Sequence, residues 1–431
     1  MTGRAVITGV GAVSGFGIGV ARLWAGLARG DCAVGPIRSF DASSFPTRVA
    51  AEVPLLRIAA ATVAEELGPG ARETWLPRLA RWERAGVLRD RKVAFALLAA
   101  DEAWRTAGCG PDERGAWLCL ASGLEHGFLE DLARLFDGRH IDWSAEDRAG
   151  LHEVRFRSPV DLPAACVAEA LDLRGRRVVH VSACAAGALA VAHAASLVER
   201  GAASIVLCGG VDSLVNPLAL GGMTRIGAPS PRNERDACRP FDRRRDGLVI
   251  GEGAAVLVVE AEERAVARGA RPLARVLGWG STQDAHRPTA PLPDGRAAAR
   301  AMTRALARAG VAPGDVGYVN AHGTGTPLND PAEARAIRAA LGGHADSVPT
   351  SSIKGAVGHL MVASGAIEIA ASLLCFERDL LPGTAHHREP DPECDIEIIG
   401  EAPRPARVDV VLSNSFGFGG QNAAVLLGRV P

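Results

Sequence analysis

Two sets of segments share the same order of apolar run, glycine-rich turn and helical stretch, and this repetition constrains the fold more than any other feature. The first set comprises RAVITGVGAVSG, GAWLCLASGL, RVVHVSACAAG, ASIVLCGGVDS and GAAVLVVE, and the second comprises PLARVLGWGST, VGYVNAHGTGT, SVPTSSIKGAVGHL and VDVVLSNSFGFGG. Helical patterns such as AAARAMTRALARAG and AEARAIRAALGG lie between these apolar runs. Alternating strands and helices predict a layered α/β fold.

The two sets also correspond in detail. RVVHVSACAAGALAVAHAASL matches PTSSIKGAVGHLMVASGAIEIAASLL as strand, reactive loop and small-residue helix, and ASIVLCGGVDSL matches VDVVLSNSFGFGG. We therefore expect two related halves, residues 1–262 and 263–431, whose loops meet at a shared site. Segments 66–90 and 124–160 are rich in charge and are expected to be helical or loop insertions that cover the core.

Composition limits the class of protein. A chain of 431 residues with 48% hydrophobic residues can bury a large core. Its apolar runs are shorter than the roughly 18 residues of a membrane helix, and MTGRAVITGV lacks the form of a signal peptide, so a cytoplasmic protein is expected. The net charge of −1 gives no general support for nucleic-acid binding.

Cysteine and histidine usage predicts neither disulfides nor a metal. The nine cysteines are odd in number and form no CxxC pair. Lone histidines such as His180 and His193 are expected to be surface groups or satisfied core groups. No metal ligand set is indicated.

Cys184 is the leading candidate for a reactive group. It lies where the apolar run from Val178 to Val181 meets an alanine-rich helical stretch, and the helix dipole at such a position favours a thiolate. His322, in YVNAHGTGTPLND, and His359, in SSIKGAVGHLMVASG, are each flanked by glycine-rich sequence. A cysteine with two such histidines indicates thioester chemistry.

The motifs SACAAG, AHGTGT, SIKGAVGHL and SNSFGFGG occur in this order and together resemble those of the β-ketoacyl-acyl carrier protein synthases, closest to the synthase II type. The resemblance is strong from about residue 175 to the end, matches RAVITGVGAVSGFG near the start, and weakens over residues 124–175. It implies a thiolase-like five-layered αβαβα fold with two pseudo-symmetric halves. It also implies a homodimer, or a heterodimer with a chain-length-factor-like subunit.

The resemblance implies an acyltransferase that catalyses decarboxylative Claisen condensation. Cys184 would hold an acyl chain as a thioester, to be extended by two carbons from malonyl-acyl carrier protein. His322 and His359 would bind the malonyl thioester oxygen and stabilise the enolate, Lys354 would maintain the charge and hydrogen-bond pattern around His359, and Glu333 would support this network. No cofactor of the enzyme itself is implied, because the substrates are carried on phosphopantetheine of the carrier protein.

Further roles follow from the same resemblance. The backbone N–H groups of Cys184 and Phe418 would receive the tetrahedral oxyanion. Thr324 and Thr326 would contact phosphopantetheine, Phe416 would contact substrate, Phe418 would gate the acyl pocket, and Leu124 would limit its depth. Basic side chains would dock the acidic carrier protein, and the candidates are Arg89, Arg91, Lys92 and Arg225.

Two alternatives stay open at this point. The chain could be the condensing subunit of a type II polyketide or polyene synthase, paired with a chain-length partner. A non-condensing acyl-binding subunit is the other alternative, and intact Cys184, His322, Lys354 and His359 argue against it.

Overall fold

The computed structural model describes residues 4–124, 126–127 and 157–430. Within them, β-strands form an 11-stranded sheet in the order β13-β12-β16-β17-β11-β1-β10-β9-β5-β8, with β2 beside β1. The strands from the first part of the chain are β1 (Ala5–Ser14), β2 (Gly17–Ile18), β5 (Trp117–Ser122), β8 (Arg177–His180), β9 (Ile205–Ser213) and β10 (Glu252–Ala261). Those from the second part are β11 (Ala274–Gln283), β12 (Tyr318–Asn320), β13 (Thr350–Ser351), β16 (Val410–Gly417) and β17 (Gln421–Gly428).

The strand order is mirrored about the junction of β1 and β11. Outward from that junction, β10, β9, β5 and β8 on one side correspond to β17, β16, β12 and β13 on the other. The junction itself consists of two residue pairs, Val6 with Arg275 and Ile7 with Ala274. The sheet therefore has two halves that are joined along a short stretch.

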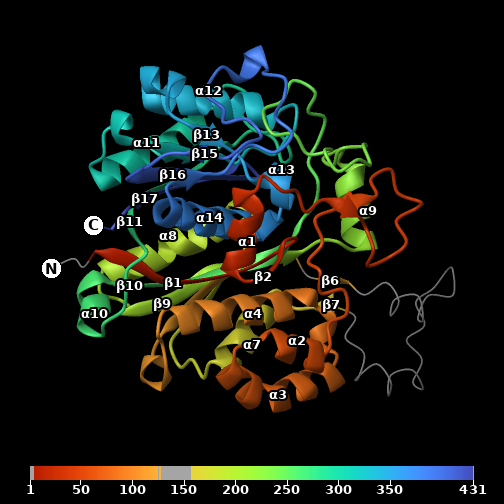
Figure 1. Cartoon of the computed structure of the whole chain (residues 1–431), viewed down its shortest axis with the longest axis vertical. Helices are drawn as coiled ribbons and strands as arrows, with labels where there is room; N and C mark the ends of the chain where they lie inside the picture. Colours follow the sequence, from red (N-terminus) through yellow and green to blue (C-terminus); the bar gives the residue numbers. More distant parts are fainter. Residues whose placement is uncertain (1–3, 125, 128–156, 431) are drawn as a thin grey trace.

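Helices and the two sheet halves form five layers (Figure 1). Helices α8 (Ala186–Glu199) and α14 (Ser364–Arg378) lie between the sheet halves. The outer layer on one side contains α11 (Arg296–Ala309) and α12 (Asn329–Leu341). The outer layer on the other side contains α4 (Arg91–Thr106) and α7 (Leu162–Ala170). Helices α2 (Ala60–Glu66) and α3 (Pro69–Arg84) lie outside α4 and α7. This arrangement confirms the predicted thiolase-like αβαβα fold.

The central helices approach each other closely because each contributes a glycine. A Cβ atom on Gly187 of α8 would lie 2.8 Å from the carbonyl oxygen of Val362, and one on Gly365 of α14 would lie 2.6 Å from the backbone nitrogen of Ala188. Both helices are buried on nearly all sides, as expected for helices without a polar face. Each follows a short 3₁₀ turn, Ala183–Ala185 before α8 and Met361–Ala363 before α14, and each turn begins with a residue of positive φ, 46° for Ala183 and 48° for Met361.

The remaining elements are peripheral or short. They are α1 (Val20–Ala28), α9 (Pro217–Arg225), α10 (Glu262–Ala267), α13 (Lys354–Val357), and the strands β3 (Gly35–Pro36), β4 (Val49–Ala50), β6 (His126–Gly127), β7 (Arg157–Ser158), β14 (Leu380–Leu381) and β15 (Arg404–Pro405).

Every apolar run named from the sequence contains a strand, and helices separate most of these strands, as expected for an α/β fold; β16 and β17 follow each other without a helix. Antiparallel pairs join β9 to β10 and β16 to β17, and the sequence analysis did not identify β17. The charged segment 66–90 contains helix α3, as expected, whereas most of segment 124–160 lies outside the described residues. The proposed division after residue 262 falls at the start of α10 and stays a prediction.

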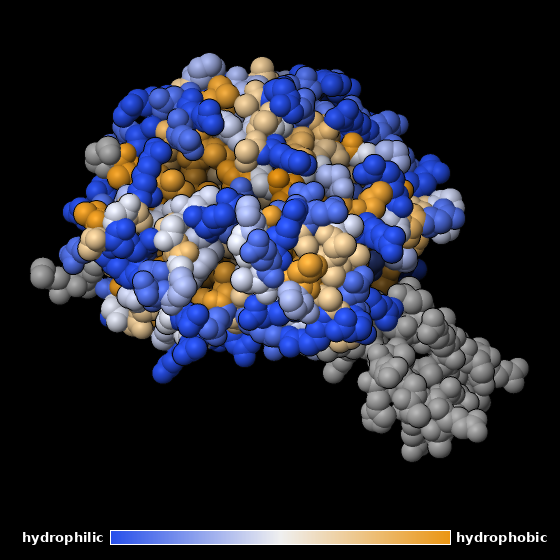
Figure 2. Space-filling model, turned by 60° about the horizontal axis from the view of Figure 1, so that its bottom comes forward, coloured by the Kyte–Doolittle hydropathy of each residue, from blue (hydrophilic) through white to orange (hydrophobic). Residues whose placement is uncertain are grey.

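The face shown in Figure 2 is mainly hydrophilic. On the face shown in Figure 2, hydrophobic side chains form several patches between charged and polar ones. Among the described residues, no helix is both long and apolar enough to span a membrane.

Candidate active site

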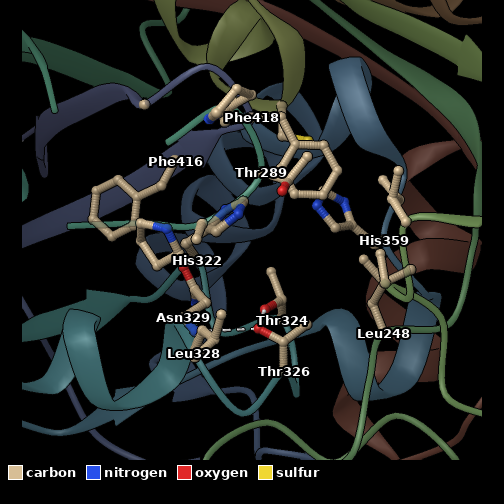
Figure 3. Close-up of a pocket in the computed structure, with 18 of the residues that line it drawn as sticks. Leu248, Thr289, His322, Thr324, Thr326, Leu328, Asn329, His359, Phe416 and Phe418 are labelled. Carbon is tan, nitrogen blue, oxygen red and sulfur yellow. Dashed lines mark hydrogen bonds between the residues drawn. The ribbon is translucent and has the colours of Figure 1, made fainter. Parts of the chain in front are cut away.

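Cys184, His322 and His359 line one cavity of about 220 Å³. Cys184 precedes α8 in the first half of the chain, whereas His322 follows β12 and His359 follows α13 in the second half. Residues that line the same cavity include Thr324, Thr326, Leu328, Phe416 and Phe418 (Figure 3). The mirrored halves thus bring the three predicted reactive residues to one place.

The Cys184 thiol is buried, with 6% of the residue exposed. Burial raises its pKa to about 12, while the positive charge of Lys354 and the backbone N–H of Phe418 act in the opposite direction. Burial therefore acts against the thiolate expected at this helix end, and the resting thiolate stays a prediction. The backbone N–H of Phe418 is directed at the sulfur of Cys184.

His359 is held as a neutral imidazole with its proton on Nε2. Its Nδ1 accepts a hydrogen bond from the backbone N–H of Met361 at 3.1 Å and lies 2.9 Å from the hydroxyl oxygen of Ser364. Because Nδ1 is an acceptor, the hydrogen-bond pattern assigns the proton to Nε2. Burial, followed by the charge of Lys354, lowers the pKa of His359 well below its usual value.

His322 has the same tautomer for a different reason. The ammonium nitrogen of Lys354 lies 3.3 Å from Nδ1 of His322, and an ammonium can only donate. Burial is again the largest cause that lowers the pKa of His322, with Lys354 and His359 contributing. The centroids of the two imidazole rings are 5.3 Å apart, and their planes are nearly perpendicular. Both rings lie between Phe418 and the Thr324–Thr326 pair (Figure 3).

Lys354 acts on His359 through its charge, as expected, and its hydrogen bonds are to His322, which the sequence analysis did not anticipate. Its ammonium donates to the backbone carbonyl of His322 and forms a buried ion pair with Glu368. Burial raises the pKa of Glu368 to about 7, and Lys354 acts against this rise. The sequence analysis missed Glu368, although a single acid in the apolar helical run SGAIEIAASLL is a signal for a buried, paired carboxylate.

Two carboxylates hold the loop that carries His322. Glu333 accepts the backbone N–H groups of His322 at 2.8 Å and Gly323 at 2.7 Å. Asp330 accepts the backbone N–H of Thr324 at 3.0 Å. Glu333 therefore supports the site by fixing backbone, and Asp330, which the sequence analysis missed, does the same one turn earlier in α12.

The predicted substrate-binding residues surround the two histidines. The hydroxyl oxygens of Thr324 and Thr326 are 2.9 Å apart. The ring centroid of Phe416 is 5.5 Å from that of His322, and Phe418 is half-buried at the opposite side of the cavity (Figure 3). Leu124 lies elsewhere: it is 66% exposed and does not line the cavity, so its predicted role in limiting pocket depth is not supported by this chain alone.

Two of the predicted docking residues have partners inside the chain: Lys92 is buried, which makes its predicted docking role wrong, and Arg91 is partly buried against Glu252. Lys92 is fully buried, donates to the backbone carbonyl of Leu124 at 2.6 Å and lies 3.6 Å from the carboxylate of Asp90. Arg91 makes two hydrogen bonds to the buried carboxylate of Glu252. Lys92 is therefore inaccessible to a protein partner, and docking by Arg91, whose side chain is 13% exposed, is not supported.

Arg89 and Arg225 are exposed, as a docking residue must be. Arg225 ends helix α9 and precedes Ile226, which is 47% exposed and lines the mouth of the cavity. Docking by Arg89 and Arg225 stays a prediction.

Comparison with known proteins identifies the family. The family model described as "Beta-ketoacyl synthase, N-terminal domain" matches residues 3–265, and the one described as "Beta-ketoacyl synthase, C-terminal domain" matches residues 273–388. The chain is 36% identical to 3-oxoacyl-acyl-carrier-protein synthase 2 of Coxiella burnetii, with 99% of each chain covered. It is 39% identical to the putative polyketide beta-ketoacyl synthase 1 of Streptomyces cyaneus, covering 99% of this chain and 98% of the relative.

Solved structures agree with this relationship. The ishigamide ketosynthase/chain length factor shares 32% identity and superimposes with a TM-score of 0.82, and both chains are fully covered. A type II polyketide synthase acyl-carrier protein in complex with its ketosynthase, bound to the hexaketide, gives a TM-score of 0.84 at 28% identity with full coverage of both chains. Fold and cavity define a thiolase-like condensing enzyme. The chain belongs to the β-ketoacyl synthase family.

Proposed function

We propose that this enzyme condenses a malonyl unit with an acyl chain held on Cys184, with both substrates delivered by acyl carrier protein. In the first half-reaction the sulfur of Cys184 attacks the acyl thioester, and the departing phosphopantetheine thiol takes the proton. In the second, the bond from the malonyl unit to its carboxylate breaks and carbon dioxide leaves. The electron pair forms an enolate whose carbon attacks the acyl carbonyl and displaces Cys184.

The observation that supports this proposal best is the shared tautomer of the two histidines. Lys354 and the backbone N–H of Met361 occupy the Nδ1 atoms, so each Nε2–H is available to the cavity as a neutral donor. Two such donors suit the thioester oxygen, which gains negative charge when carbon dioxide leaves. One preorganised donor of this kind typically contributes about 3 to 4 kcal/mol to lowering the barrier.

The second site of charge development is the tetrahedral intermediate on Cys184. The backbone N–H of Phe418 points at the sulfur, and the N–H of Cys184 itself lies beside Gly417, where a Cβ atom would be 3.1 Å away. These two N–H groups are proposed as the oxyanion donors. The absence of a side chain at Gly417 keeps them accessible.

Carrier docking is proposed around the cavity mouth. Ile226 and Leu328 line the cavity and remain 47% and 61% exposed, so the mouth has an apolar rim. Arg225 beside Ile226 and Arg287 beside Pro288, which also lines the cavity, add positive charge that would attract an acidic carrier protein. Thr324 and Thr326 would then contact the phosphopantetheine arm inside.

Incubation of the purified enzyme with acyl carriers, followed by intact-mass spectrometry, tests the proposal. We expect acyl transfer to Cys184, no transfer or condensation in Cys184→Ala, and normal activity in the matched control Cys109→Ala, whose thiol lies outside the cavity. His322→Ala and His359→Ala should still accept the acyl chain but lose malonyl decarboxylation by roughly 100-fold or more. Condensation by Cys184→Ala would refute the assignment.

A second candidate is the same chemistry within a heterodimer. One solved relative is a ketosynthase/chain length factor, and strand β8 ends the described sheet order with Val181 58% exposed directly after it. We propose that a second subunit, either another copy or a chain-length-factor-like chain, packs at this edge. Sedimentation of Val181→Lys should show a shift toward monomer, and an unchanged mass would exclude this surface.

A further inference from the structure

Three potential metal ligands converge outside the active-site cavity, although their spacing in the sequence gave no indication of it. Cys119 lies in the middle of β5, His180 ends the neighbouring strand β8, and His193 lies on α8, which packs against both strands. The thiol and one ring nitrogen of each histidine all lie within 4.8 Å of one another. Nε2 of His180 is 3.1 Å from Nδ1 of His193.

The donor atoms have the chemistry that zinc requires. Burial lowers the pKa of His180 to about 4 and also lowers that of His193, so both imidazoles are neutral and can offer lone pairs. Without a metal, one of the facing nitrogens must carry a proton and the contact is a hydrogen bond. A tetrahedral zinc ion with bonds of about 2.0 to 2.3 Å would place neighbouring ligand atoms roughly 3.3 to 3.6 Å apart. The two histidine nitrogens, 3.1 Å apart, are close to that spacing, and the thiol lies within 4.8 Å of a nitrogen of each ring.

We propose that Cys119, His180 and His193 bind one Zn²⁺ ion, with water as the fourth ligand. Binding would replace the thiol proton of Cys119, whose pKa is raised to about 12 by burial, and would release that proton to solvent. The two histidines are half-buried whereas Cys119 is fully buried, so the ion would enter from the histidine side.

The position of this cluster suggests what the ion does. β8 and α8 are the elements on either side of Cys184, and the proposed ion joins them to β5. None of the three ligands lines the active-site cavity. The ion is therefore structural: it would fix the strand and helix between which the nucleophile lies, without contacting substrate.

The proposal is tested by titrating metal-free enzyme with Co²⁺. The enzyme carries Cys184→Ala, so that the cavity thiol cannot bind the metal. We expect one Co²⁺ per chain, a thiolate-to-cobalt charge-transfer band, displacement by one equivalent of Zn²⁺, and a higher unfolding temperature with either metal. Cys119→Ala should lose the band. The matched control Cys208→Ala, which removes the buried thiol paired with Cys119 on the next strand, should keep it.

His180→Asn provides a second variant, because its partly exposed side chain can change without opening the core. Loss of this ligand should weaken Co²⁺ binding by at least about tenfold. A wild-type protein that binds no Co²⁺, or a His180→Asn protein that binds it as tightly as its parent, would show that the cluster is only a histidine–histidine hydrogen bond beside a buried thiol.

Discussion

Individual side chains at the reacting centre derive their properties from burial. The same dry environment that lowers the pKa values of His322 and His359 also raises that of the Cys184 thiol. For the histidines this is useful, because a neutral Nε2–H donates to an oxygen that becomes negative. For the cysteine, burial opposes the effect of the helix end, which favours a thiolate.

The pH dependence of Cys184 alkylation tests this description. Because the thiol pKa is raised to about 12, the thiolate fraction should rise about tenfold per pH unit across neutral pH. The rate of iodoacetamide alkylation of Cys184, followed by peptide mass spectrometry, should therefore increase from pH 6 to pH 9 without levelling. A plateau below pH 9 would mean that the helix end and Phe418 overcome burial.

At the scale of elements, the contact between α8 and α14 fixes the geometry of the site. Gly187 and Gly365 let the two backbones touch, and the turns before these helices carry Cys184 and follow His359. This contact fixes the position of Cys184 relative to His359. His322 lies on the loop after β12, which Glu333 of α12 holds separately.

Gly365→Ala should separate these helices. The added methyl group would meet the backbone nitrogen of Ala188 at 2.6 Å, and overpacking of this kind typically costs about 1 to 3 kcal/mol. We expect a lower urea midpoint and a loss of condensation in the protein that remains folded. Gly343→Ala is the control, because no heavy atom lies within 4 Å of the position that its methyl group would occupy, and it should leave both measurements unchanged.

Much of this arrangement could be predicted from the sequence, because apolar runs and motif order report strands and reactive loops. Cys184, His322 and His359 were identified in this way, and they line one cavity. Burial of polar groups was harder to predict. Lys92 and Lys354 look alike in sequence, and only packing reveals that one binds loop carbonyls and the other Glu368. Strand direction, as in the hairpin of β16 and β17, was also not encoded in apolar periodicity.

The whole molecule presents its cavity mouth to a carrier protein, and two variants separate docking from folding. Arg225→Glu should raise KM for the acyl carrier several-fold at low salt, with kcat and stability unchanged, because a rim charge acts mainly on encounter.

Lys92→Met should instead lower the free energy of unfolding by roughly 3 to 5 kcal/mol, since it removes the ammonium that pairs with the buried carboxylate of Asp90.

The control for docking is Arg407→Glu. Arg407 is exposed and precedes β16, so it lies at the end of that strand opposite Phe416 and the cavity. Its substitution changes the net charge as Arg225→Glu does and should leave KM unaltered. Equal effects of the two variants on KM would show that only overall charge matters.

Of the two related turns before α8 and α14, only one carries a thiol to which an acyl chain can be attached. Ala183 and Met361 open the two turns, and the next residue is Cys184 in one and Val362 in the other. The two related turns thus provide one thiol to which an acyl chain can be attached. The second turn follows His359, which is proposed to help form the carbon nucleophile. In the proposed reaction, an acyl chain bound to Cys184 has no second thiol within these two turns to which it could be transferred. In the proposed reaction the attacking carbon belongs to the carrier-bound unit, so the product forms on the carrier protein and must be transferred back to Cys184 before a further round of extension.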